Sequence, residues 1–329
     1  MRQVAALAAC ALVAVEVMVP AQERGATQVM VDARAALGGE KLAAVRTLTA
    51  TGRTLRSDPS GATRENEFEL AVELPDKYLM RSVMVAMGNM SVYRNAGFNG
   101  GQVIEEIDRP PNLQGGNVMI RVAGPGGAAM DPAKMTPEQK AEADRMRLVA
   151  NRKEYARLAL GLFASSPAVF PLEFTYAGQA ESADGRAEVI DVKGEGDFTG
   201  RLFIDAGTHL PLMLSWTDKE PLVIQMGPGG TAAAGGGGVR VVTSQGPANM
   251  SKEELEKFQK DLEERRKEAE AKRRVVEYRV YYSDYRDVAG VTLPHRIQRS
   301  IDGKTTEEMV FDSFKVNPKI SASKFQVTK

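Results

Sequence analysis

Alternating apolar and polar residues, separated by tight turns, constrain this chain more than any other feature. From Arg46 the side-chain period becomes two, which is typical of β-strands. Strand-like runs then follow along the chain at 63–74, 77–85, 90–95, 102–106, 172–180, 186–193, 199–205, 210–217, 222–226, 275–282, 292–301 and 304–314. Most are joined by short turns with no helix between them, and such strands pair antiparallel. The sequence therefore predicts an antiparallel sheet and not βαβ units.

Two dipeptides mark the sharpest turns. Asp184-Gly185 and Asp302-Gly303 each lie between alternating runs, and Asp-Gly in that position is a strong signal for a two-residue hairpin. A third turn is expected at Asn99-Gly100-Gly101. These turns fix which strands are neighbours.

Three helices are expected around the sheet. A short one has Val29, Ala33 and Leu37 on one face and ends at Gly38-Gly39. Each of the other two follows a Gly-rich stretch, and they cover about 137–163 and 252–274. Their starts carry capping boxes, with Thr136, Pro137 and Gln139 in the first and Ser251 and Glu254 in the second. We treat the two stretches, about 110–165 and 227–274, as insertions into one α+β domain spanning 22–329.

The second insertion has two interpretations. Its helix has only a thin apolar stripe, and Glu263 with Lys267 is one of several i,i+4 charge pairs, so it can be a solvated arm. It can also be a movable lid or docking arm whose glycines at 227–238 act as a flexible hinge. These glycines lack the spacing of a phosphate-binding loop, which argues against a nucleotide site.

The N-terminus resembles a secretory signal. Arg2 supplies the positive start, an apolar run extends from Val4 to Val19, and Ala21 is the small residue before cleavage. We expect residues 1–21 to be removed and the remainder to be periplasmic or secreted. An uncleaved membrane anchor is the alternative, although Glu16 interrupts the apolar run.

Cys10 opens a second interpretation of the same segment. Leu7-Ala8-Ala9-Cys10 has the form of a lipobox, which would make the protein an outer-membrane lipoprotein lipidated at Cys10. Because Cys10 is the only cysteine, ordinary cleavage leaves no thiol for redox chemistry or metal binding. The 43 basic and 43 acidic residues balance, so nothing predicts a nucleic-acid partner.

No catalytic pattern stands out. His209 and His295 lie in separate strand-like runs, without the spacing of a metal site, and structural roles explain them. Asp284 and Asp287 fall in a polar turn, where turn chemistry accounts for them. We therefore expect no enzyme activity, no catalytic residue, no metal and no cofactor.

Two apolar strand faces are the best candidates for a binding surface. Alternate residues share one side of a strand, so each set below would form one face. The ordinary interpretation is packed core, and the functional one is the lining of a concave apolar pocket for a lipid or small molecule. The candidate lining residues are Leu210, Leu212, Leu214, Trp216, Val276, Tyr278, Val280 and Tyr282.

Several short motifs along the chain occur together. They are Ala35–Leu42 with Val45–Leu48, Phe203–Asp205 with Thr208–Pro211, Ser283–Arg286 with Gly290-Val291 and Leu293-Pro294, and Asn317-Pro318 with Phe325. In this order they resemble the LolA-like family of outer-membrane lipoprotein carriers. The resemblance implies an antiparallel sheet curled into a half-open barrel around helices, with an apolar concave face that holds acyl chains. The chain departs from the family after Asn99-Gly100, where Gln102 and Val103 stand instead of a tryptophan, and the two insertions are additions that could cover the cavity.

Two functional hypotheses follow. The first is a periplasmic, non-enzymatic carrier that binds a lipid, acyl chain or lipoprotein. The second is a cell-envelope interaction or structural protein that docks a partner through its helical insertions. A continuous apolar cavity would favour the first, and a filled barrel would favour the second.

Overall fold

The computed structural model describes residues 25–57, 63–87, 90–108, 135–183, 185–225, 231–235, 238–239 and 252–326. The signal segment with Cys10, the cap residue Ser251 and most of the two Gly-rich stretches lie outside these ranges. The helices are α1 (Ala26–Ala36), α2 (Glu40–Ala43), α3 (Pro137–Phe163), α4 (Lys252–Ala271) and the 3₁₀ helix η3 (Ala322–Phe325). The strands are β1 (Thr47–Ser57), β2 (Thr63–Glu73), β3 (Lys77–Met87), β4 (Met90–Asn99), β5 (Gln102–Asp108), β6 (Leu172–Ser182), β7 (Gly185–Gly194), β8 (Phe198–Asp205), β9 (Pro211–Lys219), β10 (Leu222–Gln225), β11 (Thr231–Gly235), β12 (Gly238–Val239), β13 (Val275–Val288), β14 (Val291–Ile301) and β15 (Lys304–Val316).

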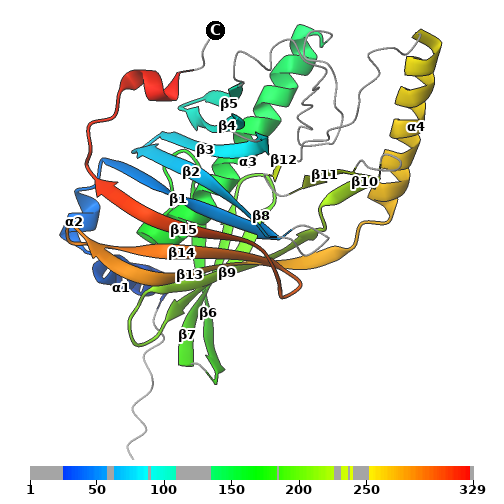
Figure 1. The fold of residues 1–329 in the computed structure, drawn as a ribbon. Coiled ribbons are helices and arrows are strands. Elements are labelled where there is room, and N and C mark those ends of the chain that lie inside the picture. Colours follow the sequence, from blue (N-terminus) through cyan, green and yellow to red (C-terminus); the bar gives the residue numbers. More distant parts are fainter. Residues whose placement is uncertain are drawn as a thin grey trace, which may run out of the picture.

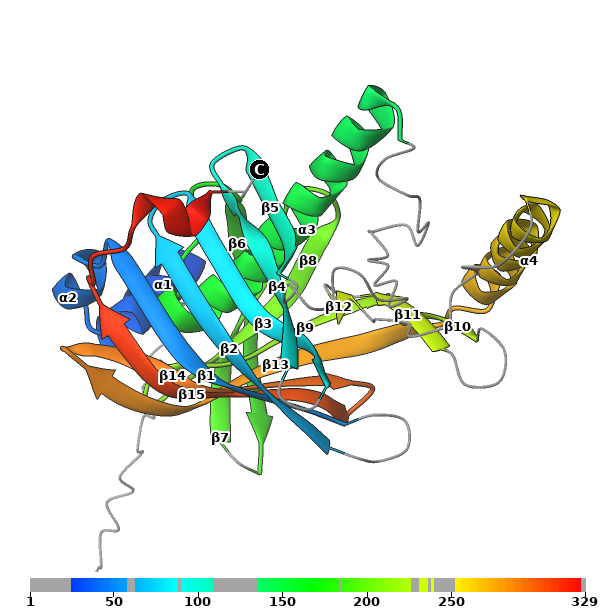
Figure 2. The ribbon, with the colours of Figure 1, turned by 45° about the horizontal axis from the view of Figure 1, so that its top comes forward.

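One twelve-stranded antiparallel sheet dominates the described structure. Its strand order is β5-β4-β3-β2-β1-β15-β14-β13-β9-β8-β7-β6, so β5 and β6 are its two edges and the sheet does not close. Leu48 pairs with Val316 where the first strand joins the last. The sheet curls around α3, as Figures 1 and 2 show. The predicted class, an antiparallel sheet forming a half-open barrel around helices, is confirmed.

Helix α3 forms where the sequence predicts it and holds the sheet from inside. Thr136 accepts a hydrogen bond from the Gln139 amide, and Gln139 Oε1 accepts one from the Thr136 amide, so the capping box is complete. Only the C-terminal half of the helix is buried, from Asn151 onward. At its end Arg34 of α1 donates to the Phe163 carbonyl, which supplies a partner that a helix C-terminus otherwise lacks. The predicted insertion therefore contributes this half-helix to the core.

The predicted hairpins are present. Asp302 and Gly303 both have positive φ, 47° and 76°, and Ile301 pairs with Lys304, as a type I′ turn requires. Ser182 pairs with Gly185 across the β6–β7 turn, although Asp184 itself lies outside the described residues.

Two features of the second predicted insertion differ from the sequence predictions. Helix α4 ends at Ala271, not Arg274, because the Arg274 carbonyl accepts from the Glu220 amide and so begins the sheet. Part of the predicted flexible hinge, Thr231–Gly235, is strand β11, which pairs with β10 and β12 in a small second sheet. Backbone pairing therefore orders these five residues, of which only Gly235 is a glycine.

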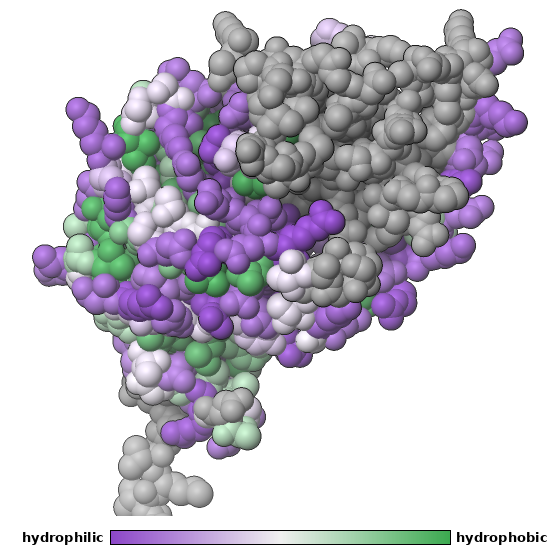
Figure 3. Space-filling view, viewed as in Figure 1, coloured by the Kyte–Doolittle hydropathy of each residue, from purple (hydrophilic) through white to green (hydrophobic). Residues whose placement is uncertain are grey.

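The face seen in Figure 3 is mainly hydrophilic over its described residues, and its apolar residues form small separate patches. The main core lies instead between the sheet and α3. Within the described ranges, every helix is too short or too polar to span a bilayer.

Candidate functional site: the concave face near Trp216

The two predicted apolar faces do meet. Strands β9 and β13 pair antiparallel, so that Leu214 lies opposite Val280 and Trp216 opposite Tyr278. Leu214, Val280 and Tyr282 belong to the main core, and each is at most 3% exposed. Leu210 and Trp216 are partly buried and pack at its margin. Val276, 3% exposed, lies opposite Asp218 further along the same strand pair.

Leu212 does not share this face. Phe203 pairs with Met213 and Ile204 with Pro211, so Leu212 has no partner on β8 and the ladder has a bulge there. A bulge adds one residue and reverses the alternation beyond it. Pro211 is buried in consequence, while Leu212 is 38% exposed. The strict alternation assumed from the sequence is therefore wrong at this position.

The middle of the concave face is filled by α3. Gly161 lies directly against the Tyr282 ring, and a Cβ at this position would overlap the ring carbons. The Tyr282 hydroxyl donates to the Arg157 carbonyl at 2.6 Å. Because burial raises the pKa of Tyr282 above its usual value, the phenol stays protonated and keeps this bond. The deepest of the predicted lining residues thus pack against a helix.

Beyond this packed region lies a cluster that we call the aromatic–arginine platform, made of Trp216, Tyr278 and Arg157. The rings of Trp216 and Tyr278 stack with centroids 5.3 Å apart and planes 8° apart. The Arg157 guanidinium lies 4.2 Å from the Trp216 ring centroid, within the range of a cation–π contact. All three side chains are partly buried, so the platform combines apolar ring surface with a positive charge at the edge of the core.

An ionic chain connects the platform to the sheet. Glu154 of α3 binds Arg157 at 2.6 Å and Arg299 of β14 at 2.7 Å. Arg299 also lies 3.5 Å from Glu307, which pairs with Arg56. The Glu154 and Arg299 side chains are 17% and 29% exposed, so water screens these pairs only in part.

The two carboxylates of this chain stay ionised. Burial alone would raise the pKa of Glu154, but Arg299 and Arg157 outweigh it, and the pKa lies below its usual value. The pKa of Glu307 is likewise lowered because Arg56 and Arg299 outweigh its burial. Three guanidinium groups and two carboxylates thus alternate along this chain, from Arg157 at the platform to Arg56 at the far end.

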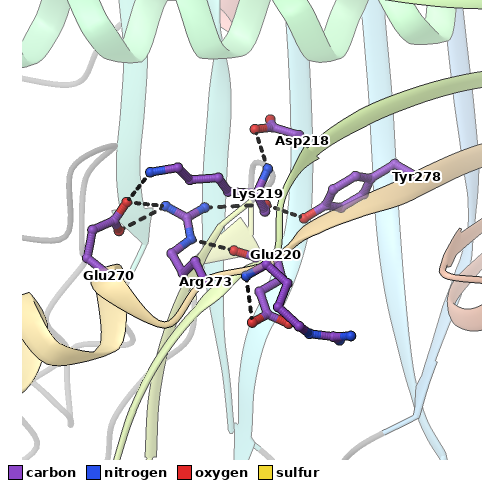
Figure 4. A network of polar contacts seen from close by, with 7 residues as sticks. Asp218, Lys219, Glu220, Glu270, Arg273 and Tyr278 are labelled. Carbon is purple, nitrogen blue, oxygen red and sulfur yellow. Dashed lines mark hydrogen bonds and ion pairs between the residues drawn. The ribbon is translucent and has the colours of Figure 1, made fainter.

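The platform is also joined to the base of α4 (Figure 4). The Tyr278 hydroxyl donates to the Lys219 carbonyl at 2.9 Å, and burial, together with the charge of Asp218, raises the pKa of Tyr278 to about 12. Arg273 binds the Glu220 carbonyl and Glu270, and Lys219 binds Glu270 at 3.1 Å. These contacts fix the end of α4 beside β9 and β13.

The other candidates have structural roles. His295 is buried, its Nδ1 lies 3.1 Å from the Leu293 carbonyl, and its ring meets Phe314 edge-on. His209 has a φ of 59° in the β8–β9 turn, and Asp284 pairs with Arg286. Within the described ranges, no three His, Cys, Asp or Glu side chains lie together as a metal site would need.

Sequence reasoning did not single out Arg157, Glu154 or Arg299. Glu154 and Arg157 are three apart on a helix, which is a common surface spacing. Arg299 is 145 residues from Glu154, and nothing local indicates that contact.

No protein-family model matches the chain, and no curated protein matches it in sequence. Among solved structures, it is similar to a LolA superfamily protein from Nitrosomonas europaea, with a TM-score of 0.44, 7% identity, and 92% of this chain and 98% of that one covered.

Two further solved structures are similar. One is an outer-membrane lipoprotein-sorting domain from Vibrio parahaemolyticus, with a TM-score of 0.39, 7% identity, and 90% and 94% of the two chains covered. The other is a DUF1329 family protein from Desulfovibrio piger, with a TM-score of 0.44, 6% identity, and 92% and 98% covered. These likenesses are too distant to transfer any activity or ligand. The open antiparallel half-barrel rests on the strand pairing described above.

Proposed function

We propose that the chain is an exported, non-catalytic protein that binds a lipid, an acyl chain or the acylated part of a lipoprotein at the aromatic–arginine platform. The observation that carries this proposal is the stacked Trp216–Tyr278 pair with Arg157 beside it, partly exposed at the margin of an apolar core. Tryptophan and tyrosine rings suit sites that are apolar on one side and wet on the other. The Arg157 guanidinium beside the rings suits a ligand with an anionic or polar head.

The filled centre of the concave face limits how such a ligand would bind. Because Gly161, Tyr282 and Arg157 hold α3 against the sheet, the acyl part would lie at the platform end and not along the whole half-barrel. Leu210 and Leu212 lie at the other end of β9 and are therefore not part of this proposed site.

Native mass spectrometry of protein purified gently from its own envelope tests this function. We expect bound lipid in the unmodified protein and a lower load in Trp216→Ala. Tyr281→Ala is the matched control, because Tyr281 lies on the paired strand β13 with Tyr278 but alternates to the opposite face. Recovery of no lipid, or an equal load in Trp216→Ala, would contradict the proposal.

A second candidate is an envelope protein that docks a partner through α4. The supporting observation is that α4 stands away from the main sheet in Figures 1 and 2 and, among the described elements, packs mainly on β10. Replacing 252–271 by a short linker separates the two functions. Loss of a cross-linked partner with an unchanged lipid load would support docking, and loss of lipid with no partner would support the carrier.

A further inference from the structure

A second cavity lies on the opposite face of the sheet, under the C-terminal segment. We call residues 317–326 the C-terminal strap. The strap leaves the end of β15 and runs past β3 toward β4 and β5 (Figure 2). Between it and the outer face of β1 and β3–β5 is a groove of about 590 Å³. This volume falls within the range of small-molecule sites.

Both ends of the strap are pinned. At the first, Asn317 Oδ1 accepts from the Arg46 amide at 2.7 Å, and Pro318 accepts from the Thr47 hydroxyl at 2.7 Å. At the second, Phe325 is 1% exposed and its carbonyl accepts from the Asn99 side chain. The residues between the pins therefore bridge the groove without filling it.

The groove has an apolar floor. Leu79 and Ile104 are on the strand side, and they form a small core with Ala71 and Phe325, against which Ile320 of the strap packs. This core is separate from the one between the sheet and α3. An apolar group entering the groove would meet these side chains.

The rim carries uncompensated positive charge. Lys315 and Lys319 line the groove, are exposed, and have no acidic partner among the described residues. The other cations there are neutralised, since Lys324 pairs with Glu69 and Arg81 with Glu69 and Asp108. Glu106 is the one carboxylate among the described lining residues, so two free ammonium groups dominate the rim.

From this arrangement we propose that the strap groove binds an anionic amphiphile. Its carboxylate or phosphate head lies between Lys315 and Lys319, and its short apolar chain lies on Leu79, Ile104 and Ile320. This site is independent of the platform and faces the other side of the sheet.

Isothermal titration calorimetry with decanoate and decyl phosphate tests the site, with decyl maltoside and inorganic phosphate as partial ligands. We expect one-site binding of at least one anionic amphiphile, weakened by salt, and much weaker binding of the two partial ligands. Decanoate binding alone would indicate a fatty-acid type of head, and decyl phosphate binding alone a phosphate head.

Lys315→Gln combined with Lys319→Gln should weaken binding about tenfold or more, equivalent to about 1.4 kcal/mol. Lys304→Gln, at the start of β15 and outside the groove, should leave it unchanged.

Equal binding of the neutral amphiphile, unchanged binding in the double variant, or binding of inorganic phosphate as tight as that of decyl phosphate would overturn the proposal. The same titrations followed by the fluorescence of Trp216, the only tryptophan, report on the platform. Groove binding should leave that signal unchanged, so the two sites are read separately.

Discussion

Gly161 shows how one residue can decide where a helix lies. Its missing side chain lets the α3 backbone approach the Tyr282 ring, and the ring hydroxyl then reaches the Arg157 carbonyl one turn earlier. The close approach also places Arg157 over Trp216. The position of the platform therefore depends on the absence of a methyl group from α3.

We expect Gly161→Ala to destabilise the protein although alanine is the better helix former. The added methyl would overlap the Tyr282 ring, and overpacking of this kind typically costs about 1–3 kcal/mol, more than the roughly 1 kcal/mol gained in helix propensity. Urea unfolding followed by circular dichroism measures the change. Combining Gly161→Ala with Tyr282→Leu should recover part of the lost stability, because the ring that the methyl overlaps is then absent. A Gly161→Ala variant as stable as the unmodified protein would contradict the close contact between residue 161 and the Tyr282 ring.

At the scale of single elements, the capping box makes a local prediction for α3. The first turns of this helix are exposed, so they depend on the cap more than on packing. Thr136→Ala should lower the local stability of this end of the helix by about 1 kcal/mol. Amide hydrogen exchange should then be faster in residues 140–148. Exchange in the buried half, after Asn151, should not change. Thr136→Ser retains the acceptor oxygen and is the control.

The base of α4 makes a second prediction. Arg273 joins Glu270 of α4 to the Glu220 carbonyl of the β9–β10 turn (Figure 4). Arg273→Gln should raise the mobility of α4, measured as faster amide exchange in 265–271, while global stability changes by less than about 1 kcal/mol because the contacts are partly exposed. Arg274→Gln removes a longer contact of 3.4 Å and should have the smaller effect.

Local signals explain which elements could be predicted from sequence. Helix α3 was predicted with its observed bounds because Thr136, Pro137 and Gln139 act within four residues of one another. Strand β13 was expected to end at Tyr282 but continues to Val288, because pairing with β14 and not apolar composition sustains it. The bulge at Leu212 shows no signal in the apolar pattern, and the contact between Glu154 and Arg299 joins residues 145 apart, so the platform could not be derived from sequence.

For the whole molecule, the ionic chain makes stability depend on pH. Glu154 and Glu307 have a pKa below the usual 4.5 when folded, so the unfolded chain binds more protons as the pH falls. Their contribution is complete above about pH 5 and is lost as the pH falls through the folded values. The urea concentration at the unfolding midpoint should therefore decrease when the pH is lowered from about 6 to about 3.

Glu154→Gln isolates this effect. It should lower the free energy of unfolding by about 1–3 kcal/mol at neutral pH, less than for a fully buried pair because both partners are partly exposed. The variant should also lose less stability when the pH is lowered. Glu142→Gln, on the exposed start of the same helix, serves as the control. If stability falls equally steeply with pH in Glu154→Gln and in the unmodified protein, Glu154 is not the cause of the pH dependence.

The pairing of β1 with β15 has a consequence for how the chain acquires its fold. Arg46 and Asn317 form a hydrogen bond where these two strands meet, although they are 271 residues apart. Strand β1 therefore pairs with its second neighbour, β15, only after nearly the whole chain has been synthesised. Contacts of such long range form slowly, and until then β1 and its neighbours β2–β5 present an open strand edge. The growing polypeptide would thus pass through a stage in which both halves of the sheet are built but unjoined. A nascent chain stalled before residue 304 should be sensitive to protease and to aggregation, whatever the stability of the finished protein.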